Sequence, residues 1–211
     1  MNSSMTQRAS NRIDIELVKG FMDRLKGLDG SNTLLIDTPT TMVAKTNFFL
    51  LKGLLDLEDK KGFFVALDRP YQNMDYLLKN HDIDRRKIWY IDTITGISGE
   101  KKKEMKNVDF VNKSFEIENM VEVFERDTDR DGFGSMGDVD FVLIENLSPM
   151  LNYNSIEKIE KFVKSFSDMI DRYENVLGCI VMDSEAHEEL YELVRKFVNH
   201  TIEVKDLMEE F

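Results

Sequence analysis

Residues 33–55, with the sequence TLLIDTPTTMVAKTNFFLLKGLL, contain the arrangement that determines the expected fold of this chain. The run opens with a short apolar segment between turn-forming residues, which is typical of a buried strand. A polar turn follows, and the next apolar stretch predicts a helix over 41–57. This order of strand, loop and helix is used by many α/β proteins to bind phosphate groups, because the helix amino terminus presents unsatisfied N–H groups.

The same alternation of strand and helix continues on both sides of this segment. Apolar runs predict further strands over 62–67, 87–91, 108–111, 139–144, 177–182 and 201–204. Apolar residues at helical spacing predict helices over 13–28, 71–79, 116–126, 155–173 and 185–197. The polar stretches 92–107 and 127–138 are expected to be loops, and the polar residues 1–11 are expected to be frayed.

The strand runs have no internal polar alternation, which indicates burial on both faces, as in a parallel sheet covered by helices. We therefore predict an α/β fold with three layers, α/β/α, and a mostly parallel central sheet. With 211 residues the chain is long enough for one such domain. We expect an N-terminal polar segment and helix over 1–32 and the α/β domain over 33–211.

Composition excludes several classes of function. The formal net charge of −12 disfavours binding to nucleic acid or to an anionic membrane surface. One cysteine, Cys179, rules out an internal disulfide and a thiolate metal cluster, and three scattered histidines make a histidine-built metal site improbable. The opening sequence MNSSMTQRASNRIDIE has no apolar core and does not resemble a secretory signal, so we expect a cytoplasmic protein.

The turn after the first strand aligns with the phosphate-binding pattern GxxxxGK[ST]. Lys45 and Thr46 take the lysine and threonine positions, whereas Pro39 and Ala44 stand at the two glycine positions. Lysine would contact the terminal phosphates and threonine would hold magnesium, but proline lacks an N–H and alanine resists positive φ. The alternative is a lysine and a threonine on the first turn of an ordinary helix.

Three long segments together resemble the KaiC-like type of RecA-superfamily ATPase. They are residues 33–84, the segment VDFVLIENLSPML at 139–151, which resembles the Walker B strand, and the closing strand–helix–strand segment at 179–206. By the order of its elements the resemblance covers roughly 33–206. It implies a P-loop fold that binds ATP and Mg²⁺, with nucleotide-binding positions at Thr41, Ala44, Lys45, Thr46 and Glu145.

The positions that carry catalysis in this family are altered. Adjacent catalytic glutamates follow the second strand in the family, where this chain has Asp68 and Arg69. Asp68 is a shorter candidate base and Arg69 cannot accept a proton, so the pair also fits a strand-ending turn with a surface ion pair. Glu145 replaces the usual Walker B aspartate and would shift the position of a bound magnesium, or it simply ends its strand.

These departures predict a pseudo-ATPase, a non-catalytic KaiC/RecA-like domain that acts through protein partners in regulation or signalling. On this interpretation no cofactor is expected, and the partner is another protein or a second copy of the chain in a homo-oligomer. The alternative is a weak ATP-binding protein or a Mg²⁺-dependent ATPase that uses a divergent P-loop.

The acidic loop suggests a third function. Asp127, Asp129, Asp131 and Asp138 match most of the calcium-binding pattern D-x-D-x-D-G-x₅-E, and Gly132 allows the sharp turn that the pattern needs. Aspartate replaces the final glutamate, and a strand rather than a helix is expected to follow. The alternatives are therefore a Ca²⁺-binding module and an acidic loop that binds no metal.

Overall fold

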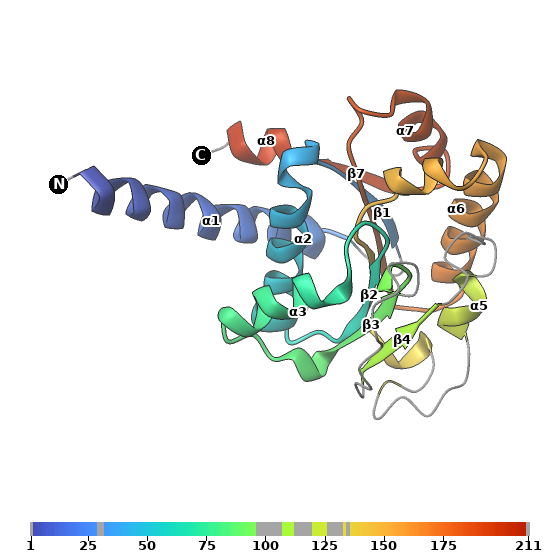
Figure 1. The fold of residues 1–211 in the computed structure, drawn as a ribbon, viewed down its shortest axis with the longest axis horizontal. Coiled ribbons are helices and arrows are strands. Elements are labelled where there is room, and N and C mark those ends of the chain that lie inside the picture. Colours follow the sequence, from blue (N-terminus) through green and yellow to red (C-terminus); the bar gives the residue numbers. More distant parts are fainter. Residues whose placement is uncertain are drawn as a thin grey trace.

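The computed structural model describes residues 2–28, 32–95, 107–111, 120–125, 133 and 136–209, with the side chains described from residue 14 onward. Figure 1 shows a central sheet between two layers of helices. The predicted loops at 92–107 and 127–138 lie largely outside the described residues. Among the described helices, none has both the length and the apolar composition of a membrane span.

The sheet has seven strands in the order β4-β3-β2-β5-β6-β1-β7, and every neighbouring pair is parallel. The strands are β1 (Asn32–Asp37), β2 (Gly62–Ala66), β3 (Ile88–Asp92), β4 (Val108–Phe110), β5 (Phe141–Ile144), β6 (Leu177–Met182) and β7 (His200–Glu203). Strand β6 lies between β1 and β5, with Leu34 of β1 beside Cys179 and Leu143 of β5 on the other side of Cys179. The prediction of an α/β fold with a parallel sheet is confirmed.

The helices pack on both faces of the sheet. One face is covered by α1 (Asn2–Lys26), α2 (Val43–Lys52), the π-helical turn η2 (Gly53–Leu57), α3 (Tyr71–Asn80) and α8 (Val204–Glu209). The other face is covered by α5 (Met120–Glu125), α6 (Ile156–Ile170) and α7 (Glu188–Val194). Short 3₁₀ turns connect these elements, namely η1 (Thr40–Met42), η3 (Arg85–Lys87), η5 (Met136–Asp138) and η6 (Ser148–Asn152).

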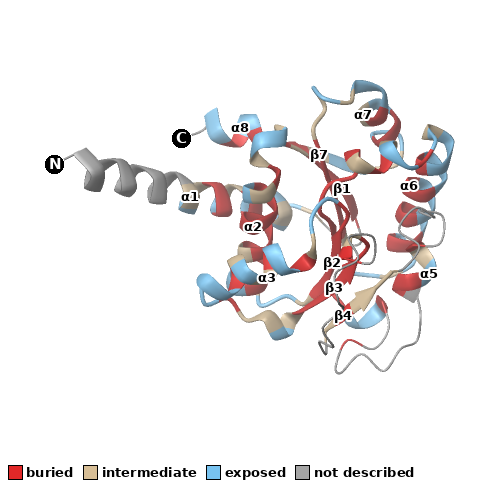
Figure 2. Ribbon diagram, viewed as in Figure 1, coloured by how far each residue is buried: buried red, intermediate tan, exposed pale blue. Residues whose placement is uncertain are grey.

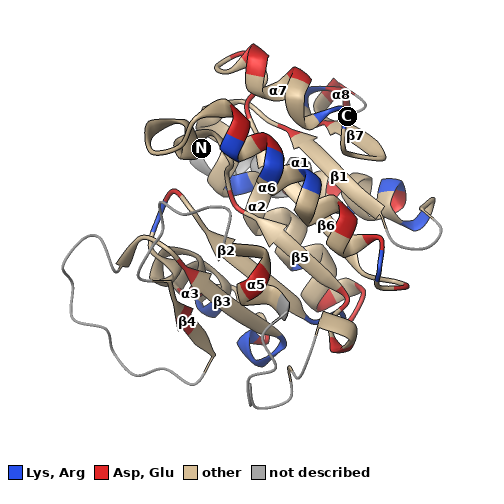
Figure 3. Ribbon diagram, turned by 90° about the vertical axis from the view of Figure 1, so that its right-hand side faces the viewer, with Lys and Arg blue, Asp and Glu red and all other residues tan. Residues whose placement is uncertain are grey.

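Two apolar clusters, one on each face of the sheet, form the core. In β1, Leu34 and Ile36 pack with the α1–α2 layer, whereas Leu35 packs with the α6 layer. The five inner strands of the sheet are therefore buried on both sides, which explains why they lack polar alternation, whereas the edge strands β4 and β7 are only partly buried (Figure 2). Helix α6 is amphipathic, and its outer surface carries both acidic and basic residues (Figure 3).

The helices differ from the prediction most at the N-terminus, around α2 and at the C-terminus. Helix α1 begins at Asn2, although residues 1–11 were expected to be frayed, because good helix formers such as Gln7, Arg8 and Ala9 favour helix without an apolar pattern. The expected helix over 41–57 is divided into η1, α2 and η2. Helix α8 was not predicted, since its two buried residues, Val204 and Leu207, form too short a pattern to recognise.

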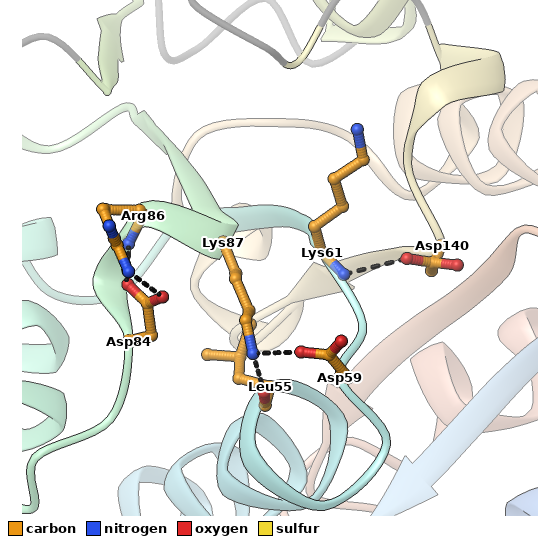
Figure 4. Close-up of polar contacts among 7 residues, drawn as sticks. All are labelled: Leu55, Asp59, Lys61, Asp84, Arg86, Lys87 and Asp140. Atoms are coloured by element: carbon orange, nitrogen blue, oxygen red, sulfur yellow. Dashed lines mark hydrogen bonds and ion pairs between the residues drawn. The ribbon is translucent and has the colours of Figure 1, made fainter.

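Polar contacts join the loops at the amino-terminal edge of the sheet (Figure 4). The Lys87 ammonium donates to the carbonyl oxygen of Leu55 at 2.8 Å and pairs with Asp59 at 2.5 Å. The backbone N–H of Lys61 donates to the Asp140 carboxylate at 2.9 Å. These contacts hold the starts of β2, β3 and β5 together, and the predicted nucleotide-binding residues lie at the opposite, carboxyl edge.

Candidate functional site

The predicted nucleotide-binding residues come from three elements that meet at the carboxyl edge of the sheet. The turn after β1 continues through η1 into α2 and carries Lys45 and Thr46. Asp68 follows β2, and Glu145 follows β5. Because the strands are parallel, their carboxyl ends lie at one edge, where ligands bind in open α/β sheets.

The backbone of the turn after β1 is folded on itself. The N–H of Thr38 donates to the carbonyl oxygen of Met182 at 2.9 Å, and the N–H of Met42 donates to that of Pro39 at 2.7 Å. The N–H of Val43 donates to Thr40 O. The N–H groups of Met42 and Val43, both within the aligned phosphate-binding pattern, are therefore used in hydrogen bonds inside the turn, and η1 replaces an open row of donors.

The Asp183 carboxylate accepts a hydrogen bond from a further backbone N–H of this turn. The backbone N–H and the hydroxyl of Thr40 both donate to Asp183 Oδ2 at 2.6 Å, while Asp183 Oδ1 accepts from the N–H groups of Glu185 and Ala186. Burial tends to raise the pKa of Asp183, but the hydrogen bonds from Thr40, Ala186 and Glu185 outweigh it and hold the pKa below its usual value. Asp183 thus provides the negative charge that the turn binds.

The lysine of the aligned motif is directed toward α1. Lys45 Nζ lies 2.7 Å from Asp14 Oδ1 and 5.3 Å from the centre of the Phe49 ring. Both partners lie outside the turn, one on α1 and one on the next turn of α2. The ammonium is therefore held by an ion pair and a cation–π contact, in the region between these two helices.

Thr46 and Asn47 are buried at the start of α2. The hydroxyls of Thr46 and Thr38 share a hydrogen bond of 2.9 Å, and Asn47 Nδ2 donates to the carbonyl oxygen of Glu145 at 2.8 Å. The other two residues aligned with the motif are more accessible, since Thr41 is exposed and Ala44 is half-buried. The Asn47 contact brings the turn after β1 close to the end of β5.

Glu145 connects the end of β5 to the turn after β2. Its side chain is buried, with a residue exposure of 5%, and its Oε2 lies 3.3 Å from the N–H groups of both Asp68 and Arg69. Burial raises the Glu145 pKa to about 7, although the two N–H groups favour the ionised form. The Asp68 carboxylate lies 3.9 Å from Arg69 Nε. The structure thus brings Glu145 and Asp68 together, with Glu145 anchoring the turn.

Three acidic residues of this edge were not assigned to the nucleotide-binding position from the sequence. They are Asp37, Asp92 and Asp183, which follow the apolar runs of β1, β3 and β6 in the same way as Glu145 follows that of β5. The Asp37 carboxylate accepts from the N–H and the hydroxyl of Ser184 at 2.9 and 2.7 Å. An acidic residue directly after each of these apolar runs is visible in the sequence and could have indicated these positions.

Asp92 is fully buried and is surrounded by donors. Its carboxylate accepts, at 3.0 Å, from the N–H of Tyr71, the first residue of α3. It also accepts from the N–H groups of Ile94 and Thr95 and from the Thr95 hydroxyl, at 2.7 to 2.8 Å. Asp92 thus fixes the start of α3 and the residues after β3, several strands away from the turn after β1.

The cavity beside the turn is small. It is lined by Asp37, Pro39, Asp183, Ser184, Glu185, Glu203 and Lys205 and has a volume of about 10 Å³. That volume is at the lower limit for one water molecule. A phosphate group would need the surrounding side chains to move.

Most of the predicted calcium ligands lie outside the described residues, namely Asp127, Asp129 and Asp131. Asp138 is described and is exposed at the end of η5. Within the described part of the chain, no group of three or more His, Cys, Asp or Glu side chains is arranged to hold a metal ion.

Comparisons with known proteins identify relatives by structure alone. No family model and no curated protein matches the sequence. A KaiC-like protein from the hyperthermophilic archaeon Pyrococcus horikoshii matches over 82% of this chain and 70% of its own, with 12% identity and a TM-score of 0.56. An uncharacterized protein from the same species, solved in complex with an unknown peptide, matches over 86% and 81%, with 12% identity and a TM-score of 0.62.

Proposed function

Since this chain has a KaiC-like fold of the RecA superfamily, we propose that it is a non-catalytic member that acts by binding protein partners. In this function the P-loop architecture serves as a scaffold, and its role is regulatory. The proposal rests on the observation that side chains and backbone donors at the phosphate-binding position already bind other residues of the protein. Lys45 is paired with Asp14, and Thr40 is bound to Asp183.

Nucleotide binding would have to break these contacts. A phosphate-binding loop works because several backbone N–H groups converge on the ligand. Here the N–H groups of Thr38, Met42 and Val43 donate to carbonyl oxygens, and that of Thr40 donates to a carboxylate. An entering triphosphate would displace the Asp183 carboxylate and would meet a negatively charged edge, which makes binding unfavourable.

The residues at the catalytic positions also support a non-catalytic function. A general base for hydrolysis must be ionised and must reach the attacking water. Glu145, at the Walker B position, is buried, and its Oε2 already accepts from the N–H groups of Asp68 and Arg69, so this carboxylate is not free to orient a magnesium-bound water. Asp68 has a short side chain, and Arg69 beside it cannot accept a proton.

A role in protein binding has support from the structural neighbours. The Pyrococcus horikoshii protein in complex with an unknown peptide shares the fold of this chain over 86% of its length. A fold of this type is thus compatible with holding a peptide segment. We extend this property to the present chain as part of the proposal.

Isothermal titration calorimetry with Mg-ATP tests the proposal, with Lys45→Ala as the matched variant. We expect no saturable heat for the wild-type protein up to millimolar Mg-ATP, and no phosphate release in a colorimetric assay. Saturable heat that disappears in a folded Lys45→Ala variant would contradict the proposal and would identify a nucleotide-binding protein.

Weak ATP binding is the second candidate, and the environment of Asn47 favours it. Thr46, Asn47 and the end of β5 lie together at the position where magnesium is bound in P-loop proteins. Asn47 Oδ1 is buried and has no hydrogen-bond partner among the described residues. This function requires that Lys45 leave Asp14, so Asp14→Ala should increase the affinity for Mg-ATP. No change in affinity would remove this candidate.

A further inference from the structure

We propose that the groove between α1 and α2 is a docking site for an acidic amphipathic helix of a partner protein. The inference deepens the proposed function, because it names the surface and the chemistry through which the partner is bound. The groove has a volume of about 400 Å³ and is lined by residues of α1, α2, η2 and the end of α3. It lies on the face of the sheet that carries the N-terminal helix (Figure 1).

Apolar side chains form both walls of this groove. Ile15 and Val18 of α1 lie on one side, and Phe48 and Phe49 of α2 lie on the other, with Leu57 of η2 at one end. Ile15 and Leu57 are 55% and 56% exposed, whereas the two phenylalanines are buried. Large exposed aliphatic side chains beside a concave apolar surface are typical of a site that a partner covers.

Two lysines and one aspartate, Asp14, accompany the apolar residues in the lining of the groove, although the whole chain has a net charge of −12. Lys19 and Lys52 line the groove and form no ion pair with any residue that the structure describes. Lys45, next to the groove, is balanced by Asp14. The local charge is therefore positive, and it favours an occupant with acidic residues on either side of its apolar stripe.

The apolar lining and the lysines of the groove favour an amphipathic helix as the occupant. A helix bound in an apolar groove presents anchors at positions i, i+3, i+4 and i+7, and its flanking residues contact the rim. A second copy of this chain would also carry a charge of −12, so long-range repulsion opposes self-association through this face. We therefore infer a short acidic segment of a different protein.

Fluorescence anisotropy with a designed peptide tests this inference. The probe is a labelled amphipathic peptide with leucines at i, i+3, i+4 and i+7 and glutamates on both flanks. The comparison peptides are a scrambled sequence of the same composition and a version with lysines in place of the glutamates. We expect saturable binding of the acidic peptide only, weakened by added salt.

Two variants of the groove provide the decisive comparison. Leu57→Glu places a charge at an exposed apolar position and should weaken binding of the acidic peptide by about tenfold or more. The double change Lys19→Glu and Lys52→Glu should reverse the preference toward the lysine peptide. Tyr153→Glu, at a 52% exposed position directly after η6 and outside the groove, is the matched control and should bind like wild type.

Equal binding of the acidic peptide to wild type and to Leu57→Glu would overturn the inference, as would binding of the scrambled peptide. A dimer in sedimentation experiments that is lost in Leu57→Glu would also overturn it, in favour of self-association. The calorimetric test is independent: if Mg-ATP binds through Lys45 while the peptide binds the groove, the proposed function fails and the docking site stands. If neither Mg-ATP nor the acidic peptide binds, the docking site is refuted and the proposed non-catalytic function stands.

Discussion

Replacing Glu145 by glutamine should stabilise the protein at alkaline pH and should remove part of its pH dependence. The Glu145 carboxyl is buried against the turn after β2, where it accepts N–H groups of Asp68 and Arg69. Burial makes ionisation of this group unfavourable, and the glutamine carbonyl oxygen can accept the same two hydrogen bonds. The substitution therefore keeps the geometry of the acceptor and removes the charge.

The pKa of Glu145 gives the sign and the size of the effect. The folded-state pKa of Glu145 is about 7, above the ordinary value of 4.5. Between these two pH values the folded protein therefore keeps a proton on Glu145 that the unfolded chain has released. The stabilisation is fully present below pH 4.5 and is lost as the pH rises through 7. A shift from 4.5 to about 7 corresponds to about 3 kcal/mol of unfolding free energy.

Urea denaturation at pH 4.5 and pH 8, followed by circular dichroism, measures this effect. The difference in unfolding free energy between wild type and Glu145→Gln isolates the Glu145 contribution from those of other titrating groups. We expect the variant to gain up to about 3 kcal/mol relative to wild type on going from pH 4.5 to pH 8. Thr41→Ala, a neutral change at an exposed position of the same edge, should follow wild type.

The reasoning would be refuted if Glu145→Gln had the same pH dependence as wild type. It would also be refuted if the variant lost stability at pH 8, because the ionised carboxylate would then stabilise the turn. In that case the hydrogen bonds from the N–H groups would outweigh the unfavourable burial of the charge.

Three further predictions concern other parts of the chain. Gly62→Ala should destabilise the protein by about 1–3 kcal/mol in urea denaturation, because a Cβ there would lie 2.2 Å from the Phe141 carbonyl oxygen of β5. Gly27→Ala is the control, since its Cβ would meet only an ordinary contact at 3.6 Å. An equal effect of both substitutions would contradict the packing argument. Asp183→Ala should lower the melting temperature, with a loss of about 1 kcal/mol, because it removes the carboxylate that accepts from the N–H and the hydroxyl of Thr40 at an exposed site where water can replace it; an unchanged melting temperature would show that the Asp183–Thr40 contact does not stabilise the turn. If the acidic loop binds calcium, millimolar Ca²⁺ should raise the melting temperature, and Asp129→Asn should remove the rise; no rise in wild type would exclude this function.

Much of the fold could be predicted because its signals are local. The run 177–182 was predicted as a strand and corresponds to β6 over the same residues, since six consecutive small or apolar residues suit a strand buried on both faces. The long helix over 155–173 corresponds to α6, whose apolar spacing is strong. The N-terminal half of α1 and the short α8 were missed, because neither shows an apolar pattern of sufficient length.

The position of the candidate site could also be predicted, whereas its contacts could not. Lys45, Asp68 and Glu145 were assigned to the ends of different strands, and a parallel sheet brings such ends to one edge. The sequence contains no sign that Lys45 pairs with Asp14 on α1 or that Asp183 accepts from Thr40, across 143 positions of the chain.

The sequence by itself determined the alternation of strands and helices, the parallel class of the sheet and the edge at which polar residues gather. These properties follow from the periodicity of apolar residues, which acts over a few turns or one strand. Only the tertiary structure decided which partner each polar side chain has. A flexible lysine or a strand-end carboxylate can reach several donors and acceptors, and the packing of α1 and β6 against the turn after β1 selects among them.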